Sequence, residues 1–279
     1  MLQHSGRDGS GITALDAVVA FASRRRLRGA ARLRRMLRGH HTVALTRIRT
    51  CDGLLFDLDV ENVLDQAVLD HGYYEREVLD ALVAHLPDDG VLWDVGANVG
   101  LHAITAQRLR PGATVVAFEP SPHTAARLIA NAELNRAAVR VVTTALSDTN
   151  GVSELSVVTR GNSGLTSLRP WPDVRYEHTI MCPCTRADFL VASGTLPTPN
   201  VVKLDVEGFE VEVLRGFGEM LTSPALRALV FEAPGGSAEA AHEHPVFDLL
   251  AKVGFKTEPL PPARAGETSV ATNFLATRR

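Results

Sequence analysis

The chain has 279 residues, of which 45% are hydrophobic and 22% charged, and its formal net charge is −3 at pH 7. This length suits one large α/β domain, or a domain with an appendage. The sequence shows no run long enough to span a bilayer, and Asp16 interrupts the apolar stretch 12–22, which argues against a signal peptide. The cysteines Cys51, Cys182 and Cys184 form no zinc pattern, so we expect free thiols and a cytoplasmic protein.

Positive charge is concentrated at the start of the chain. Residues 1–50 hold eleven arginines and two acidic residues, whereas the remainder holds 18 basic and 30 acidic residues. We predict a basic helical extension here, leading into the first strand of a hairpin. It could bind an acidic membrane surface, nucleic acid or a partner, or pack against the domain's own acidic surface. No aromatic residue is interleaved with the arginines to stack on bases, so we expect no nucleic acid partner. We favour packing of this extension against the domain's own acidic surface.

Residues 51–90 are predicted to complete the hairpin and to add helices. Two strand-like runs, 42–48 and 54–60, flank the turn signal Cys51-Asp52-Gly53. The helical segment that follows contains Tyr74 and Glu75. These two residues contact the cofactor if the segment folds over the pocket as a lid, and are surface residues otherwise.

The stretch 91–100 is the most informative part of the chain. It reads as a buried strand that ends in a glycine-rich turn and opens directly into a helix. Gly96 and Gly100 allow a ligand close to the main chain, and the helix directs its N–H groups at that ligand. The lysine of a phosphate-binding loop is absent, and Asn98 and Leu101 occupy two glycine positions of the dinucleotide fingerprint.

An acidic residue ends the next strand, 114–120. Glu119 is placed to bind the diol of a ribose. Since nothing here would neutralise a dinucleotide phosphate, the pattern favours a cationic nucleoside such as S-adenosyl-L-methionine. A third strand is predicted over 139–145, and the turn 145–148 falls where an adenine would lie. Asp148 could accept from the adenine amino group or cap a turn.

Residues 151–185 interrupt the alternation of strands and helices. Strands 153–158 and 178–185 flank a polar glycine loop, which predicts a β-hairpin inserted beside the site. Such insertions commonly shape acceptor specificity. Asn162 and Ser163 are therefore candidate acceptor contacts.

The fourth strand, 201–206, carries charges at positions where burial is expected. Lys203 and Asp205 are two residues apart, so they project from one face, where each lowers the burial cost of the other. They form either a structural ion pair or a catalytic pair beneath the acceptor hydroxyl, with Glu207 or Glu210 accepting its proton. These acids could equally hold a divalent metal, but two acids alone do not define a metal site, and no metal is predicted.

The fifth strand, 228–234, again ends in an acid. Glu232 could orient the acceptor or cap the glycine turn that follows. Two further strands, 255–259 and 273–277, are predicted to close the sheet.

Several spaced motifs occur in the order found in one known family. They are Asp94-Val-Gly-Ala-Asn-Val-Gly100, Ala117-Phe-Glu-Pro120, Ala145-Leu-Ser-Asp148, Gly161-Asn-Ser-Gly164 and Lys203-Leu-Asp-Val-Glu-Gly208. From about residue 70 to 235, the chain resembles the FkbM-type methyltransferase family. The resemblance implies a doubly wound, mostly parallel α/β sheet of seven strands with one reversed edge strand. It also implies S-adenosylmethionine-dependent O-methylation of a small-molecule hydroxyl, such as that of a sugar or natural product.

The resemblance also assigns residues to parts of the site. The methionine part would be held by Asp94, Gly96, Ala97, Asn98 and Gly100. The ribose would meet Glu119 and Pro120, the adenine Ala145, Leu146 and Asp148, and the reacting groups Lys203, Asp205 and Glu207. The lid would add Tyr74 and Glu75. The acceptor contacts do not follow from the resemblance: the expected geometry alone assigns them to Asn162, Ser163, Glu210 and Glu232.

The methyltransferase core is predicted over residues 91–279, and a homodimer is considered. Three alternatives remain. A nicotinamide enzyme is disfavoured by the missing glycines, and a nucleic-acid methyltransferase is suggested only by the arginine-rich start. The third is a non-catalytic protein that binds S-adenosylmethionine.

Overall fold

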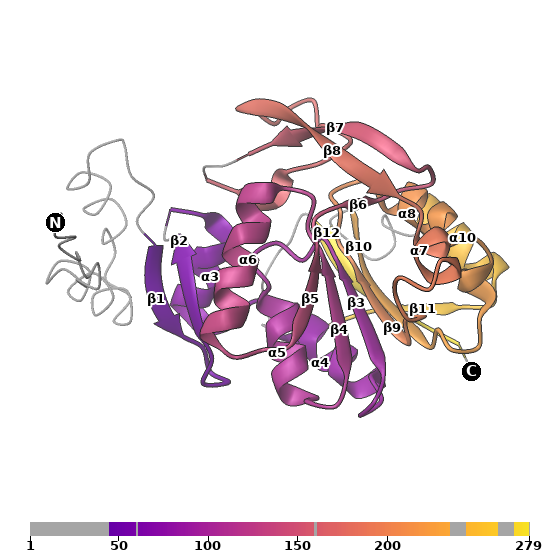
Figure 1. Cartoon of the computed structure of the whole chain (residues 1–279), viewed down its shortest axis with the longest axis horizontal. Coiled ribbons are helices and arrows are strands. Elements are labelled where there is room, and N and C mark those ends of the chain that lie inside the picture. The colour runs from indigo at the N-terminus through magenta and orange to yellow at the C-terminus, as the bar shows by residue number, and fades with distance from the viewer. Residues whose placement is uncertain (1–44, 60, 159–160, 235–243, 262–270, 279) are drawn as a thin grey trace, which may run out of the picture.

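The structure is a computed structural model that describes residues 45–59, 61–158, 161–234, 244–261 and 271–278 (Figure 1). The predicted basic extension, residues 1–44, lies outside the described residues. None of the helices within the described ranges is both long and apolar enough to cross a bilayer.

Seven strands form the central sheet, in the order β11-β12-β10-β9-β3-β4-β5. Their bounds are β3 (Val91–Val95), β4 (Thr114–Phe118), β5 (Val139–Val142), β9 (Val201–Leu204), β10 (Ala228–Pro234), β11 (Lys256–Pro259) and β12 (Ala271–Thr277). Strands β10, β9, β3, β4 and β5 pair in parallel, whereas β12 is antiparallel to both β10 and β11. The predicted mostly parallel, doubly wound sheet is confirmed.

The position of the reversed strand differs from the expectation. The reversed strand is β12, which lies between β10 and β11, so the edge strand is β11. The chain leaves β10, passes through α10 (Pro245–Lys252) and enters β11, which lies two positions from β10 in the sheet. One strand position therefore stays open between β10 and β11. The last strand returns antiparallel into that gap and pairs on both sides.

Helices cover both faces of the sheet (Figure 1). One face packs against α4 (Arg76–His85), α5 (Leu101–Leu109) and α6 (Pro122–Leu134), and the other against α7 (Ala187–Ala192), α8 (Glu210–Phe217) and α10. The α6 start is as predicted, with Ser121 as N-cap and Pro122 in the first turn. A 3-10 turn, η2 (Gly218–Thr222), follows α8.

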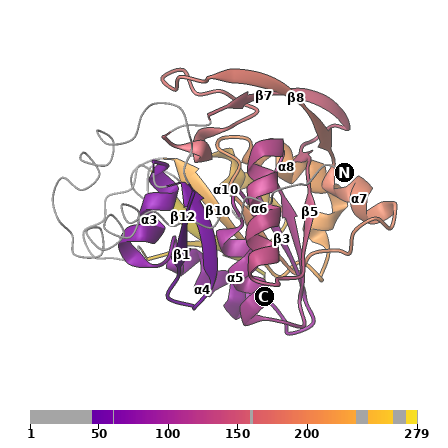
Figure 2. The same cartoon turned by 60° about the vertical axis from the view of Figure 1, so that its left-hand side comes forward.

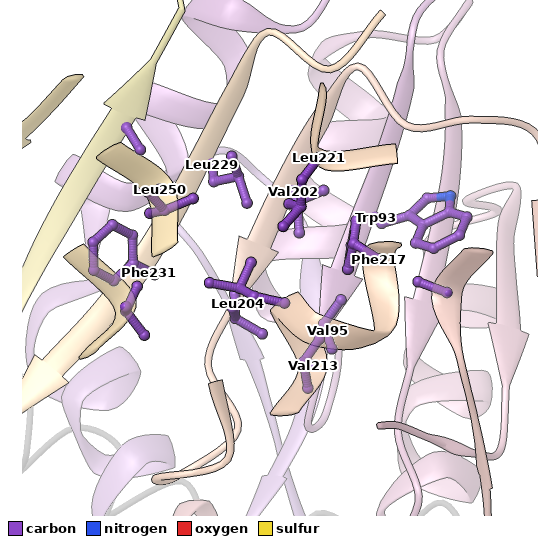
Figure 3. Packing of buried hydrophobic residues seen from close by; sticks show 14 of the residues in the cluster. Trp93, Val95, Val202, Leu204, Val213, Phe217, Leu221, Leu229, Phe231 and Leu250 are labelled. Atoms are coloured by element: carbon purple, nitrogen blue, oxygen red, sulfur yellow. The ribbon is translucent and has the colours of Figure 1, made fainter. Parts of the chain in front are cut away.

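The apolar strands alternate between the two faces, as the period of two requires. Trp93, which is fully buried, points to the α8 face, where its ring lies 5.0 Å from that of Phe118 and 5.9 Å from that of Phe217 (Figure 3). Its neighbour Leu92 belongs instead to the cluster under α4 and α5.

Two further small sheets flank the central one. The hairpin β1 (Leu45–Arg49) and β2 (Leu55–Asp59) leads to α3 (Val63–His71) and is tied to α6, because the side chains of Asn131 and Asn135 accept from β2 main-chain N–H groups. The predicted N-terminal hairpin is therefore confirmed within the described residues.

The predicted insertion is also present, as a three-stranded sheet rather than a lone hairpin (Figure 2). Strands β7 (Gly151–Val157) and β8 (His178–Thr185) pair antiparallel, and β6 (Ala145–Leu146) adds to β8. The third predicted strand, 139–145, is thus divided between two sheets. Cys182 and Cys184 are buried on β8 as free thiols, as expected.

Close packing at Gly216 gives a test of this arrangement. A Cβ at this α8 residue would lie 1.9 Å from the Ser147 carbonyl oxygen. Gly216→Ala should therefore lower the free energy of unfolding by about 2 kcal/mol, although alanine normally favours a helix. Denaturant unfolding measures this, with the exposed neighbour Arg215→Ala as a control that changes little. Equal or higher stability of Gly216→Ala would contradict the packing of α8 on this turn.

Candidate functional site

The carboxyl edge of the sheet gathers charged side chains from neighbouring strands. Asp94 on β3 and Lys203 on β9 are direct partners in the parallel register, so both project to the α4 face. Asp205 continues the same alternation beyond β9. In parallel sheets this edge is where ligands bind.

A cavity of about 320 Å³ opens at this edge. The predicted site residues that line it are Tyr74, Gly96, Ala97, Asn98, Glu119, Pro120, Ala145, Leu146, Asn162, Ser163, Lys203, Asp205, Glu207 and Glu232. Five other predicted residues are absent from its lining: Glu75, Asp94, Gly100, Asp148 and Glu210. One cavity therefore combines the predicted cofactor, catalytic and acceptor residues.

The glycine turn is fixed to strands on both sides. Gly96 has φ +82°, and a Cβ there would lie 1.8 Å from the Asp205 carbonyl oxygen, so only glycine fits. The N–H groups of Gly96 and Ala97 both donate to the Phe118 carbonyl at 3.0 Å. Asn98 also has a positive φ, 50°. Contacts with both neighbouring strands thus fix the shape of the turn.

Glu119 links this turn to the next helix. Its Oε2 accepts from the Asn98 N–H at 3.0 Å, and its Oε1 accepts from the Ser121 N–H at 2.9 Å. Burial raises the pKa of Glu119 to about 7, although both main-chain donors favour its charged form. Each carboxylate oxygen retains a second lone pair for a ligand hydroxyl in the cavity.

Lys203 is a buried cation shared by two carboxylates. It is 4% exposed, and its Nζ lies 2.9 Å from Asp205 Oδ2 and 3.7 Å from Asp94 Oδ1. Burial alone would lower the pKa of Lys203, but the nearby carboxylates outweigh it and raise that pKa. Asp94 is fully buried, and neither of its oxygens has a hydrogen-bond partner among the described residues. The predicted same-face geometry of Lys203 and Asp205 is present.

Three acids gather at the other end of the cavity. One carboxylate oxygen each from Asp205, Glu207 and Glu232 lie within 4.8 Å of one another, so the group could hold a divalent cation. Burial, and then the charge of Asp205, raises the pKa of Glu207 to about 8 and that of Glu232 to about 9. Within the described residues, no lysine, arginine or histidine forms an ion pair with either glutamate.

Behind the cavity wall, Glu75 begins α4 with a positive φ of 41°. Its Oε1 accepts from the Asn273 amide on β12 at 3.3 Å, and its Oε2 lies 3.8 Å from His102 Nε2. Burial, and then Asp205, raises the pKa of Glu75 to about 7. The adjacent Tyr74 lines the cavity, so the predicted lid segment does reach it.

Asp148 and Glu210 are held by other contacts. Asp148 accepts from Ser147 through its side chain and from Arg186 through its carbonyl. Glu210 caps the turn before α8, because its Oε1 accepts from the main-chain N–H groups of Val206 and Gly208. Their proposed contacts with adenine and acceptor stay predictions.

The insertion and α3 meet over the cavity. The Asn62 amide donates to Ser163 Oγ at 2.6 Å, and the Val63 N–H donates to the Gly161 carbonyl at 2.6 Å. Ser167 Oγ donates to the Glu207 carbonyl at 2.8 Å, which ties the insertion to the acidic end. A 3-10 turn, η1 (Ser163–Leu165), lies within this loop.

Comparison with known proteins agrees with this geometry. The family model described as the methyltransferase FkbM domain matches residues 94–256, which contain most of the cavity residues. The chain belongs to the FkbM methyltransferase family. The predicted family of S-adenosylmethionine-dependent methyltransferases is therefore confirmed.

Relatives of this FkbM-family chain include sugar and natural-product enzymes. Hexuronic acid methyltransferase AglP of Haloferax volcanii is 37% identical over 53% of this chain and 59% of its own. The 31-O-demethyl-FK506 methyltransferase FkbM of Streptomyces tacrolimicus is 33% identical over 51% of this chain and 64% of its own. The 2-O-methyltransferase NoeI of Sinorhizobium fredii is 32% identical over 48% of this chain and 60% of its own length. The chain thus matches less than two thirds of the length of each relative.

Some residues of the FkbM-family site were not predicted from the sequence. His102 lines the cavity, and burial followed by the Lys203 charge lowers the pKa of His102 to about 3, so it is uncharged. The sequence could have indicated this residue, because His102 lies in the first turn of the helix that follows the glycine loop. Leu64 and Asp65 also line the cavity, and Asp65 pairs with Arg127 at 2.7 Å. Nothing local marks these α3 residues, because only the folded chain brings α3 to the site.

The raised pKa values of Glu207 and Glu232 predict how the stability of the fold depends on pH. Glu207 and Glu232 have folded pKa values of about 8 and 9, above the ordinary 4.5, so the folded state binds these protons more tightly than the unfolded state. Their stabilising effect is full below pH 4.5 and is lost as the pH rises through 8 and 9. The double variant Glu207→Gln/Glu232→Gln should therefore raise the melting temperature more at pH 8.5 than at pH 5.5.

The exposed Glu219→Gln is the matched control for these melting curves, and it should shift neither end of the pH range. An equal effect of the double variant at both pH values would show that the pKa values of the two glutamates are not raised in the folded protein.

Proposed function

We propose that this chain transfers a methyl group from S-adenosyl-L-methionine to a hydroxyl of a small molecule, most plausibly a sugar or another natural product. The observation that carries the proposal is the single cavity with two chemically different ends. One end has the glycine turn and Glu119, and the other has Lys203 with three carboxylates.

The first end suits the nucleoside cofactor. Glu119 offers two carboxylate oxygens to a ribose diol, and Ala145 and Leu146 provide an apolar wall for adenine. The glycine turn suits the methionine part, and the Asp94 carboxylate, which pairs with Lys203 behind the cavity lining, places negative charge near its amino group. When bound, the cofactor supplies an electrophilic methyl on a sulfonium, so no covalent protein intermediate is needed.

The second end suits the acceptor hydroxyl. A hydroxyl is a weak nucleophile, and a carboxylate that takes its proton accelerates attack. Asp205 and Glu207 line the cavity here, and Lys203 fixes the orientation of Asp205. We assign proton removal to this group and the positioning of the acceptor to Glu232, with Asn162 and Ser163 from the insertion.

The acceptor class rests on the relatives. Their names specify a hexuronic acid and 31-O-demethyl-FK506 as the compounds that are methylated. Because this chain matches only part of each relative, the individual acceptor does not transfer from them.

Glu119→Ala tests the cofactor end. Loss of its charged hydrogen bonds should weaken S-adenosylmethionine binding about 10- to 100-fold. Calorimetry measures the affinity, and melting curves without nucleoside separate binding from folding. The exposed control Glu219→Gln should bind normally, because Glu219 does not line the cavity. Absence of binding to the native chain, or a preference for NAD, would refute the proposal.

Asp205→Asn tests the reacting end. This variant should retain cofactor affinity within about threefold and lose at least 100-fold in turnover, because the group that takes the proton is weakened. Mass detection of methylated methyl glycosides and of a cell metabolite extract measures turnover. Exposed Glu219→Gln is the control.

Two results would separate the remaining alternatives. Unchanged turnover in Asp205→Asn would remove this residue from the mechanism. Cofactor binding without transfer to any hydroxyl would indicate a non-catalytic binding protein.

A further inference from the structure

We infer that the reacting hydroxyl belongs to a neutral or amine-bearing part of the acceptor, and that the Glu207–Glu232 end of the cavity discriminates against carboxylate or phosphate groups. This inference rests on the proposed function and specifies the chemistry of its acceptor. It separates this chain from a hexuronic acid acceptor, which one relative's name would suggest.

The first step is the balance of charge around the acceptor end. Asp205, Glu207 and Glu232 approach one another within 4.8 Å, from the ends of two neighbouring strands. Tyr74, just before α4, also lines the cavity, whereas Glu75 and Glu210 do not line it. The three acids therefore form a cluster of like groups at this end of the cavity.

The second step is the lack of a free cation. Of the described residues that line the cavity, Lys203 is the one lysine or arginine. It already lies between Asp94 and Asp205, at 3.7 and 2.9 Å. His102 is uncharged, since burial lowers its pKa to about 3. No described cavity group is therefore available to pair with an acceptor anion.

The third step is the consequence for an anionic acceptor. A carboxylate beside the reacting hydroxyl would become one more acid beside Asp205, Glu207 and Glu232, whose oxygens already lie within 4.8 Å of one another. It would have to take up a proton or face like charges at close range, which disfavours binding. A neutral polyol avoids this cost, and an ammonium group gains attraction.

A pair of cofactor analogues tests the inference without an identified acceptor. In one analogue a carboxymethyl group replaces the transferable methyl on sulfur, and in the other a carbamoylmethyl group of the same size replaces it. Because the transferable group faces the acceptor space, the carboxylate should weaken binding at least about tenfold relative to the amide at pH 8.5. Calorimetry measures both affinities.

The ratio between the two analogues should shrink severalfold in Glu232→Gln, which removes one of the three clustered carboxylates, but not in the exposed control Glu219→Gln. Equal affinity of the two analogues in the native chain would overturn the inference. Failure of S-adenosylmethionine itself to bind would refute the proposed function instead.

A second measurement avoids added bulk if neither analogue enters the cavity. The affinity of S-adenosylmethionine relative to S-adenosylhomocysteine, which lacks the positive sulfur, should be severalfold lower in Glu207→Gln/Glu232→Gln than in the native chain. An unchanged ratio in this double variant would overturn the inference.

Discussion

The site depends on one buried cation. Lys203 projects from β9 directly opposite Asp94 on β3 and also contacts Asp205, so its charge stabilises the fully buried Asp94 carboxylate and the Asp205 carboxylate at the cavity. A buried charge without a partner is strongly destabilising, so these three side chains fix one another. They also fix the carboxyl ends of the two central strands, where the glycine turn packs against the Asp205 main chain.

The same alternation organises the remaining charges. Positions Asp94, Lys203 and Glu232 occupy the α4 face of three adjacent strands, and the intervening apolar residues fill the α8 face. The acids outnumber the described cations, and burial adds to their mutual repulsion. The result is a cavity with the glycine turn and Glu119 at one end and a cluster of acids with raised pKa values at the other.

Segments outside the core sheet complete the cavity. The insertion supplies Asn162 and Ser163, α3 supplies Leu64, and the α4 start supplies Tyr74. Their contacts are mainly hydrogen bonds between loops, such as that from Asn62 to Ser163. The glycine turn and Glu119 thus lie on the rigid sheet, whereas the opposite end of the cavity is shared with loops, which can differ between relatives without disturbing the core.

The sequence by itself determined the sheet class, the glycine turn with Glu119 and the Lys203–Asp205 pair, because strand periodicity and turn chemistry are local. The tertiary structure decided the rest. The reversed strand lies inside the edge because β12 pairs on both sides, which no local pattern encodes. Contacts such as Asn273 with Glu75 join residues 198 positions apart, and packing also brought His102 and Asp65 to the cavity. Proximity between distant segments follows from burial of the whole core, so residue pattern alone could not predict it.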